Sequence, residues 1–131
     1  MRVWSLALTL LAACGSSAPQ PAATPSAGEA HTDVTGLKAA LDQGGVTLID
    51  VRTAEEYAGG HIPGARSVPL DQLDAHLAEL SAYKDQDLYL VCEKGGRSLA
   101  ATQQLAKAGF TRPINVEGGT SAWRRAGYPV E

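Results

Sequence analysis

A cysteine at the start of a glycine-containing segment is the part of this sequence best suited to covalent chemistry. Cys92 directly follows the apolar run 88–91, and after it come Glu93, Lys94, Gly95, Gly96, Arg97 and Ser98. A short uninterrupted apolar run is typical of a strand buried on both faces of a parallel sheet. We therefore expect Cys92 at the carboxyl end of a strand, which is where open α/β sheets bind their ligands.

The residues that follow Cys92 favour an ionised thiol. Gly95 and Gly96 allow a tight turn whose amide hydrogens point toward the sulfur, and a helix beginning near Arg97 or Ser98 adds its positive end. Such surroundings lower the pKa of a thiol, so we predict a nucleophilic Cys92 that is largely thiolate at neutral pH. The alternative is a buried, inert thiol, which the glycines and the nearby Lys94 and Arg97 make the weaker reading.

The polar residues of this loop have two possible roles each. Arg97 either donates to an anionic substrate or pairs with a carboxylate as a structural strut. Lys94 either attracts an anion or is a solvated charge, and the adjacent Glu93 partly cancels its field. Ser98 is expected to cap the following helix and not to act as a nucleophile.

A second strand end lies earlier in the chain. Residues 46–51 are apolar and β-branched and lead to Asp50 and Arg52, for which we predict a supporting role at the strand tips. Thr53 and Glu56 form a capping box that begins a helix. His61 lies in a turn-rich connection, where we expect a structural role and not that of a base.

The remaining segments alternate between strand and helix patterns. We predict a short strand at 66–68, a helix carrying Leu73, Leu77 and Leu80, a helix from 98 to about 108 and a strand at 113–116. A second glycine-containing loop follows and should close over the same crevice, before a short helix that bears Trp123. This alternation predicts an α/β fold with a small central parallel sheet, helices on both faces and the active loop at the carboxyl end of a central strand.

The first residues have the order of an export signal. Arg2 is followed by a mostly apolar stretch and then by small residues before Cys14. Residues 11–14 resemble the lipobox of bacterial lipoproteins, and this resemblance implies that Cys14 is lipid-modified and becomes the first residue after cleavage. We therefore expect a signal peptide at 1–13, a lipid-anchored flexible tether at 14–30 and one domain at 31–131. The alternatives are an ordinary secretory signal cut nearby or an uncleaved amphipathic start. Because Gly15 is not acidic, the outer membrane is favoured weakly over the inner one, with the domain facing the periplasm.

Composition narrows the possible partners. The chain has 131 residues, a formal net charge of −3 and 44% hydrophobic residues, so about a hundred residues remain for one globular domain. No basic stripe with interleaved aromatic residues is present, which argues against nucleic acid. The chain has two cysteines and three histidines without metal-ligand spacing, so we expect no metal and no organic cofactor. We expect a monomer.

Taken in order, the motifs resemble those of the rhodanese-like domains over about residues 32–131. They are Asp50-Val51-Arg52, Glu56-Tyr57, the segment 60–65, the loop 92–98, Glu117-Gly118-Gly119, Ala122-Trp123 and Gly127-Tyr128-Pro129. The resemblance implies a sulfurtransferase in which Cys92 takes a sulfane sulfur from a donor such as thiosulfate. It then holds the sulfur as a persulfide and passes it to a thiol or cyanide. Because no second thiol is nearby, the acceptor must come from outside the chain.

Loop length bears on the reaction. Four residues separate Cys92 from Arg97, as in the six-residue loops of the family's sulfurtransferases, whereas related phosphatases have a seven-residue loop. A smaller ring of amides suits a persulfide better than a phosphate. A non-catalytic interaction module of the cell envelope is the second interpretation, and a phosphatase or an arsenate-reductase-like enzyme is the third.

Overall fold

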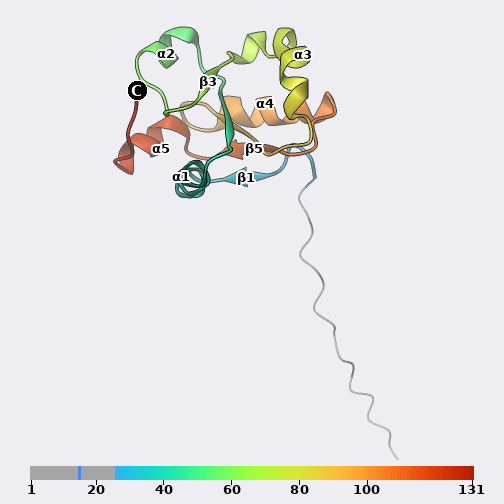
Figure 1. Ribbon diagram of the computed structural model, residues 1–131, viewed down its shortest axis with the longest axis horizontal. Helices are drawn as coiled ribbons and strands as arrows, with labels where there is room; N and C mark the ends of the chain where they lie inside the picture. Colours follow the sequence, from blue (N-terminus) through green and yellow to red (C-terminus); the bar gives the residue numbers. More distant parts are fainter. Residues whose placement is uncertain (1–14, 16–25) are drawn as a thin grey trace, which may run out of the picture.

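The computed structural model describes Gly15 and residues 26–131, and its centre is a five-stranded sheet in which every pairing is parallel. Figure 1 shows the sheet between helices on its two sides. The strands, in their order across the sheet, are β1 (His31–Thr32), β5 (Pro113–Val116), β4 (Leu88–Val91), β2 (Thr47–Asp50) and β3 (Arg66–Ser67). The predicted α/β fold is confirmed, and β4, the strand that leads to Cys92, is the central one.

Successive residues of the central strands point to opposite faces and bury two separate apolar clusters. Leu88 and Leu90 of β4 belong to the cluster under α4 (Gly96–Lys107) and α3 (Leu77–Leu80). Val91 belongs to the cluster under α1 (Val34–Gln43) and α5 (Gly119–Arg125). Because helices cover both of its faces, β4 is an almost uninterrupted apolar run in the sequence. The helices of the two faces thus fix the strand whose end carries the cysteine.

Helix starts follow local capping chemistry. Asp33 caps α1 by accepting a hydrogen bond from the amide of Gly36 at 2.8 Å. Thr53 and Glu56 form the predicted capping box at the start of α2 (Ala54–Ala58). The helix after the cysteine begins at Gly96, slightly earlier than expected, and follows Gly95, whose φ of 113° a residue with a side chain rarely adopts.

The prediction of one helix that carries Leu73, Leu77 and Leu80 is wrong. The segment consists instead of three short 3₁₀ turns and one α turn, which are η1 (Leu70–Gln72), η2 (Asp74–His76), α3 and η3 (Ser81–Tyr83). The backbone of His76, with φ −100° and ψ 1°, interrupts any continuous helix. Leu73 and Leu80 are nevertheless fully buried.

Contacts of the domain reach back into the last residues of the segment predicted as tether. The carbonyl of Gly28 accepts a hydrogen bond from the Thr102 hydroxyl at 3.3 Å, and the carbonyl of Ala30 accepts one from the amide of Asn115 at 2.9 Å. The structure thus places the last predicted tether residues against α4 and β5. The predicted signal and Cys14 lie outside the described residues. Within the described part of the chain, no helix is both long and apolar enough to cross a bilayer.

Candidate active site

Cys92 lies at the carboxyl end of β4, and its sulfur is enclosed by the turn that follows. The amide of Gly95 donates a hydrogen bond to Sγ at 3.0 Å, and the Ser98 hydroxyl lies 3.4 Å from the same sulfur. The residue is only 1% exposed, yet it lines an open cavity of about 370 Å³ together with Glu93, Lys94, Gly96 and Arg97. A small solute can therefore approach a sulfur that is otherwise buried.

Burial raises the pKa of the Cys92 thiol, but hydrogen bonds outweigh it. The Ser98 hydroxyl and the backbone amides of Ser98, Gly95 and Lys94 all favour the thiolate, and the net result is a pKa below the ordinary value. The direction agrees with what the loop sequence predicts. Of the two glycines, only Gly95 has a positive φ, while a Cβ on Gly96 would meet open space.

Ser98 does not cap the helix as predicted. The N-cap is Gly95, with no side-chain cap, and Ser98 lies inside the first turn of α4. Its hydroxyl has one hydrogen and three acceptors within reach, namely Asn115 Oδ1 at 2.5 Å, the Gly95 carbonyl at 3.2 Å and Cys92 Sγ at 3.4 Å. The prediction failed because the loop uses a left-handed glycine where a helix usually has a hydroxyl cap.

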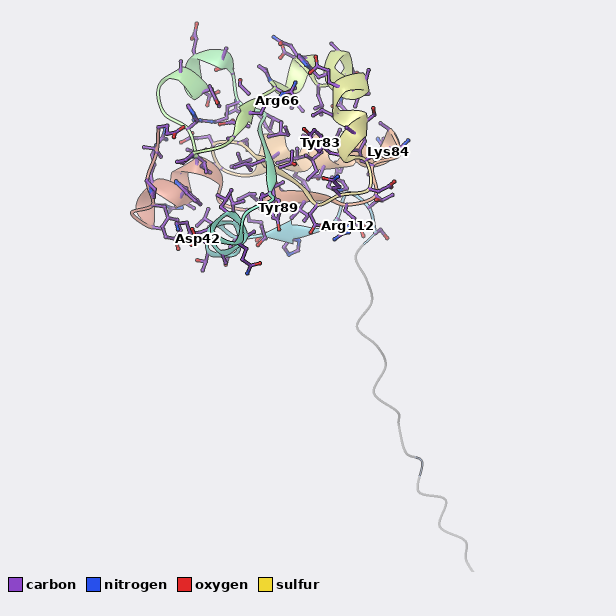
Figure 2. All side chains as sticks on the ribbon, in the orientation of Figure 1. Asp42, Arg66, Tyr83, Lys84, Tyr89 and Arg112 are labelled. Atoms are coloured by element: carbon purple, nitrogen blue, oxygen red, sulfur yellow. The ribbon has the colours of Figure 1, made fainter. Side chains whose placement is uncertain are left out.

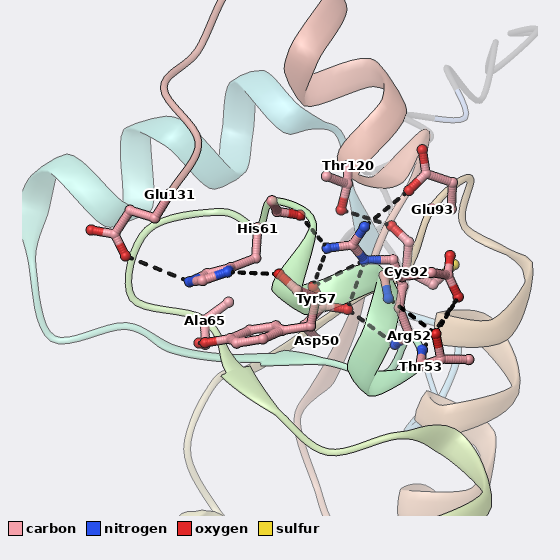
Figure 3. Close-up of polar contacts among 12 residues, drawn as sticks. Asp50, Arg52, Thr53, Tyr57, His61, Ala65, Cys92, Glu93, Thr120 and Glu131 are labelled. Carbon is pink, nitrogen blue, oxygen red and sulfur yellow. Dashed lines mark hydrogen bonds and ion pairs between the residues drawn. The ribbon is translucent and has the colours of Figure 1, made fainter.

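The charged residues at the end of β2 form a buried cluster beneath the loop (Figure 3). Both Asp50 and Arg52 are at most 1% exposed. The Arg52 guanidinium donates to Asp50 at 2.9 to 3.1 Å, to Glu93 at 3.1 Å and to the carbonyl of Gly60 at 2.8 Å. Arg124 also donates to Glu93, at 3.3 Å. Arg52 thus joins the tip of β2 to the first residue after the cysteine.

Arg97 makes a two-bond ion pair with Glu56 at the start of α2, with N–O distances of 2.6 and 2.9 Å. The hydrogen bond from Arg97 is the main reason that the pKa of Glu56 falls to about 2. The sequence left two roles open for Arg97, namely donating to an anionic substrate and pairing with a carboxylate as a structural strut. The geometry fits the strut. The guanidinium still borders the cavity above Cys92.

His61 lies in a separate part of the scaffold. Its ring stacks on Tyr57 with centroids 3.8 Å apart, and Nδ1 lies 3.0 Å from the Tyr57 carbonyl. Its backbone exchanges two hydrogen bonds of 2.9 Å with Glu131. The Glu131 carboxylate also lies 3.6 Å from Nε2 of the ring (Figure 3). These contacts place it among structural residues, and no hydrogen bond joins it to Cys92 in the described part of the chain.

The second glycine loop packs directly on the first. The amides of Thr120 and Ser121 donate to the carbonyls of Cys92 and Glu93 at 2.8 and 3.0 Å. Gly119 has a φ of 58°, and a Cβ there would collide with these two carbonyls. The start of α5 therefore holds the carbonyl side of the active loop and leaves its amides free to turn toward the sulfur.

Another cavity of about 370 Å³ lies far from this site. Its lining includes Tyr89 and Arg112, both labelled in Figure 2, and the residues that precede β2 and β4. Because all strands are parallel, this cavity lies at their amino ends, opposite the edge that holds Cys92. It brings together none of the predicted site residues.

Several residues of the site were not found from the sequence. Asn115 lies in β5, and Thr120 and Arg124 lie in α5. Their contacts with the loop depend on the order of the strands. The second glycine loop was expected to close over the same crevice, but no local pattern marks Asn115 as a partner of Ser98. Glu56 was recognised as a capping residue, whereas its pairing with Arg97, 41 positions later, leaves no trace in the sequence.

Comparison with known proteins assigns the chain to a family. The pattern of the rhodanese-like domain matches residues 33–126, and the chain belongs to this family. A sulfurtransferase of Allochromatium vinosum is 38% identical over 85 residues, which are 65% of this chain and 78% of that protein. The human thiosulfate:glutathione sulfurtransferase is 33% identical over 109 residues, with coverage of 74% and 95%. The solution structure of a rhodanese-like domain from Anabaena is 32% identical, with a TM-score of 0.71 and 79% of each chain covered.

Proposed function

We propose that this protein is a sulfurtransferase that carries a sulfane sulfur on Cys92 as a persulfide. The observation that carries the proposal is the cradle around Sγ, in which the amide of Gly95 and the hydroxyl of Ser98 face the sulfur. These donors lower the pKa of the thiol. We expect the amides of the loop 93–98 to stabilise the persulfide anion as well. Sulfurtransferases among the relatives support the same reaction class.

The reaction has two displacements at sulfur. The Cys92 thiolate attacks the outer sulfur of thiosulfate, the S–S bond of the donor breaks, and sulfite leaves with the electron pair. The product is a Cys92 persulfide anion. A thiolate acceptor then attacks the outer sulfur, so that the acceptor becomes a persulfide and Cys92 returns to the thiolate. Cyanide as acceptor leaves as thiocyanate. No net oxidant or reductant is consumed in either step.

The cavity favours this chemistry over phosphate ester cleavage. Phosphate transfer usually needs a general acid for the leaving group. Glu93 is the carboxylate among the cavity-lining residues, and it is bonded to both Arg52 and Arg124. Because each of its two oxygens already accepts from one of these guanidinium groups, neither is free to meet a leaving group.

The test is the intact mass of the protein before and after thiosulfate, and again after cyanide. Cys14→Ser in the full chain leaves Cys92 as its single cysteine, so any sulfur gained can be assigned. We expect a gain of one sulfur atom that cyanide removes. Cys92→Ser in the same background should gain none. If the thiol stays unmodified with both thiosulfate and a more reactive persulfide donor, the proposed enzymatic activity is refuted and a non-catalytic interaction module is favoured.

We also propose that Cys14 is the lipid-modified first residue of the mature chain, and that the domain is held as a monomer in a bacterial envelope facing the periplasm. The support is the order of Arg2, an apolar stretch and small residues before the cysteine. Expression of the full chain in a bacterium with two membranes should yield a chain that begins at acylated Cys14 and fractionates with membranes. A Cys14→Ser chain found equally in the membrane fraction would refute the anchor, and a dimer by size-exclusion chromatography would refute the monomer.

A further inference from the structure

A second cavity adjoins the one above Cys92 and carries unpaired positive charge. It has a volume of about 350 Å³ and is lined by Lys94, Gly118, Ser121 and Arg125. Lys94 borders both cavities, so the two are neighbours on the same edge of the sheet. Ser121 and Arg125 are four residues apart on α5 and therefore lie on one face of that helix.

The charges around the active loop are not equivalent. Arg52, Arg97 and Arg124 each lie within 4.0 Å of a carboxylate, and their charges are largely neutralised. Lys94 and Arg125 have no such partner among residues 26–131, and both are exposed. The carboxylate of Glu117, the residue before Gly118, lies within 4.0 Å of neither cation, and its Oε1 is 3.8 Å from Nε2 of His31.

The backbone fixes these two cations relative to the sulfur. The amide of Ser121 donates to the carbonyl of Glu93 at 3.0 Å, so the first turn of α5 is bonded to the residue that precedes Lys94. Ser121 adds a hydroxyl that makes no hydrogen bond within the described residues. The second cavity thus offers an ammonium, a guanidinium and a hydroxyl, which are suitable partners for a carboxylate.

From this arrangement we infer that the second cavity binds the carboxylate of the thiol acceptor while the acceptor's sulfur reaches Cys92 from the adjoining cavity. The inference rests on the proposed function and adds a substrate class to it, namely small thiols that carry a carboxylate. Arg52 and Arg97 are satisfied by protein carboxylates, so the unpaired cations of the second cavity are the ones available to a negatively charged acceptor. Arg125 and Ser121 act in selecting the acceptor and not in the chemistry at sulfur.

The experiment compares a charged with a neutral acceptor of similar size. The Cys14→Ser chain is loaded with sulfur by thiosulfate, freed of excess donor and mixed with 3-mercaptopropionate or 2-mercaptoethanol, and loss of sulfur from Cys92 is followed by mass. Arg125→Gln, Lys94→Gln and the double variant are compared with Lys107→Gln, which removes an exposed cation from the far end of α4. The readout is the ratio of second-order rate constants for the charged and the neutral thiol.

We expect this ratio to fall about threefold in each single variant, further in the double variant, and not at all in Lys107→Gln. The preference of the unsubstituted protein for the charged thiol should also shrink as salt screens the cations. An unchanged ratio in both single variants, or an equal loss with both thiols, would overturn the inference.

A second measurement does not depend on sulfur transfer. Alkylation of the Cys92 thiol by 3-maleimidopropionate and by N-ethylmaleimide should show the same shift in ratio on Arg125→Gln. If no sulfur loads onto Cys92 but this shift is present, the proposed reaction fails and the carboxylate site stands. If sulfur loads but neither ratio shifts, the site fails and the reaction stands.

Discussion

Arg52→Met should be among the most destabilising single substitutions in this domain. Arg52 is 1% exposed and supplies the side-chain donors to the Asp50 carboxylate, which is itself fully buried. Without the guanidinium, Asp50 keeps only the backbone amide of residue 52, at 3.0 Å. Glu93 and the Gly60 carbonyl lose less, because Arg124 also donates to each of them. The penalty therefore falls on one buried, unpaired carboxylate.

The expected cost is about 3 to 5 kcal/mol, the usual result of removing one partner of a buried ion pair. It is a large part of the roughly 5 to 15 kcal/mol by which a domain is stable. Equilibrium unfolding in urea measures it. With a denaturant slope of about 1.5 kcal/mol/M, the unfolding midpoint should fall by about 2 to 3 M.

The control is the double variant Asp50→Asn Arg52→Met, in which the uncompensated charge is gone. It should be more stable than Arg52→Met alone, because a neutral amide is easier to bury than a lone carboxylate. The reasoning is refuted if Arg52→Met costs less than about 1 kcal/mol, or if the double variant is no more stable than the single one.

Three further predictions concern the loop and its supports. Gly119→Ala should lower the free energy of unfolding, measured in urea, by more than about 2 kcal/mol and also slow alkylation of Cys92. The reason is that the new Cβ, at a positive φ, would collide with the Cys92 carbonyl. A folded variant whose Cys92 is alkylated at the unchanged rate would contradict this. Ser98→Ala should raise the pKa of Cys92, because it removes a donor that favours the thiolate. The pH profile of alkylation by iodoacetamide should then shift to higher pH, whereas a shift to lower pH would show that Ser98 favours the thiol. The folded pKa of Glu56 is lowered from 4.5 to about 2, so its pairing with Arg97 stabilises the protein above about pH 4.5 and this contribution is lost as the pH falls toward 2. With discounting for solvent screening, Glu56→Gln should cost about 1 kcal/mol at pH 7 and less at pH 2.5 in urea unfolding, and a pH-independent difference would be inconsistent with that pairing.

Much of the fold could be predicted because it is written in local patterns. The apolar run of β4 and the β-branched run of β2 mark buried parallel strands, and the capping box of Thr53 and Glu56 marks the start of α2. By contrast, α1 was missed, although Asp33 stands as an N-cap before apolar residues at helical spacing. β1 was missed because its two residues, His31 and Thr32, are polar and carry none of the apolar character that marks a buried strand.

The site was predictable where chemistry is local and not where it is distant in sequence. The cysteine, the glycines and the helix after them occupy consecutive positions, so the lowered pKa of Cys92 could be anticipated in direction. The partners of the loop's charges could not, because Glu93 meets Arg124 and Arg97 meets Glu56 only after the strands are ordered. The same dependence hid Asn115, which reaches Ser98 because β5 lies beside β4.

The parallel sheet also determines which way the sulfur faces. Every strand runs in the same direction, so the amino end of β1 and the carboxyl end of β4, which is followed by Cys92, lie at opposite ends of the sheet. A domain held by the residues before β1 would present its reactive edge outward, away from the surface that holds it. Strand direction thus places the sulfur and the residues that lead into β1 at opposite ends of the domain. An acceptor would meet the sulfur from the surrounding solution, and a donor embedded in the holding surface would find the amino ends of the strands instead.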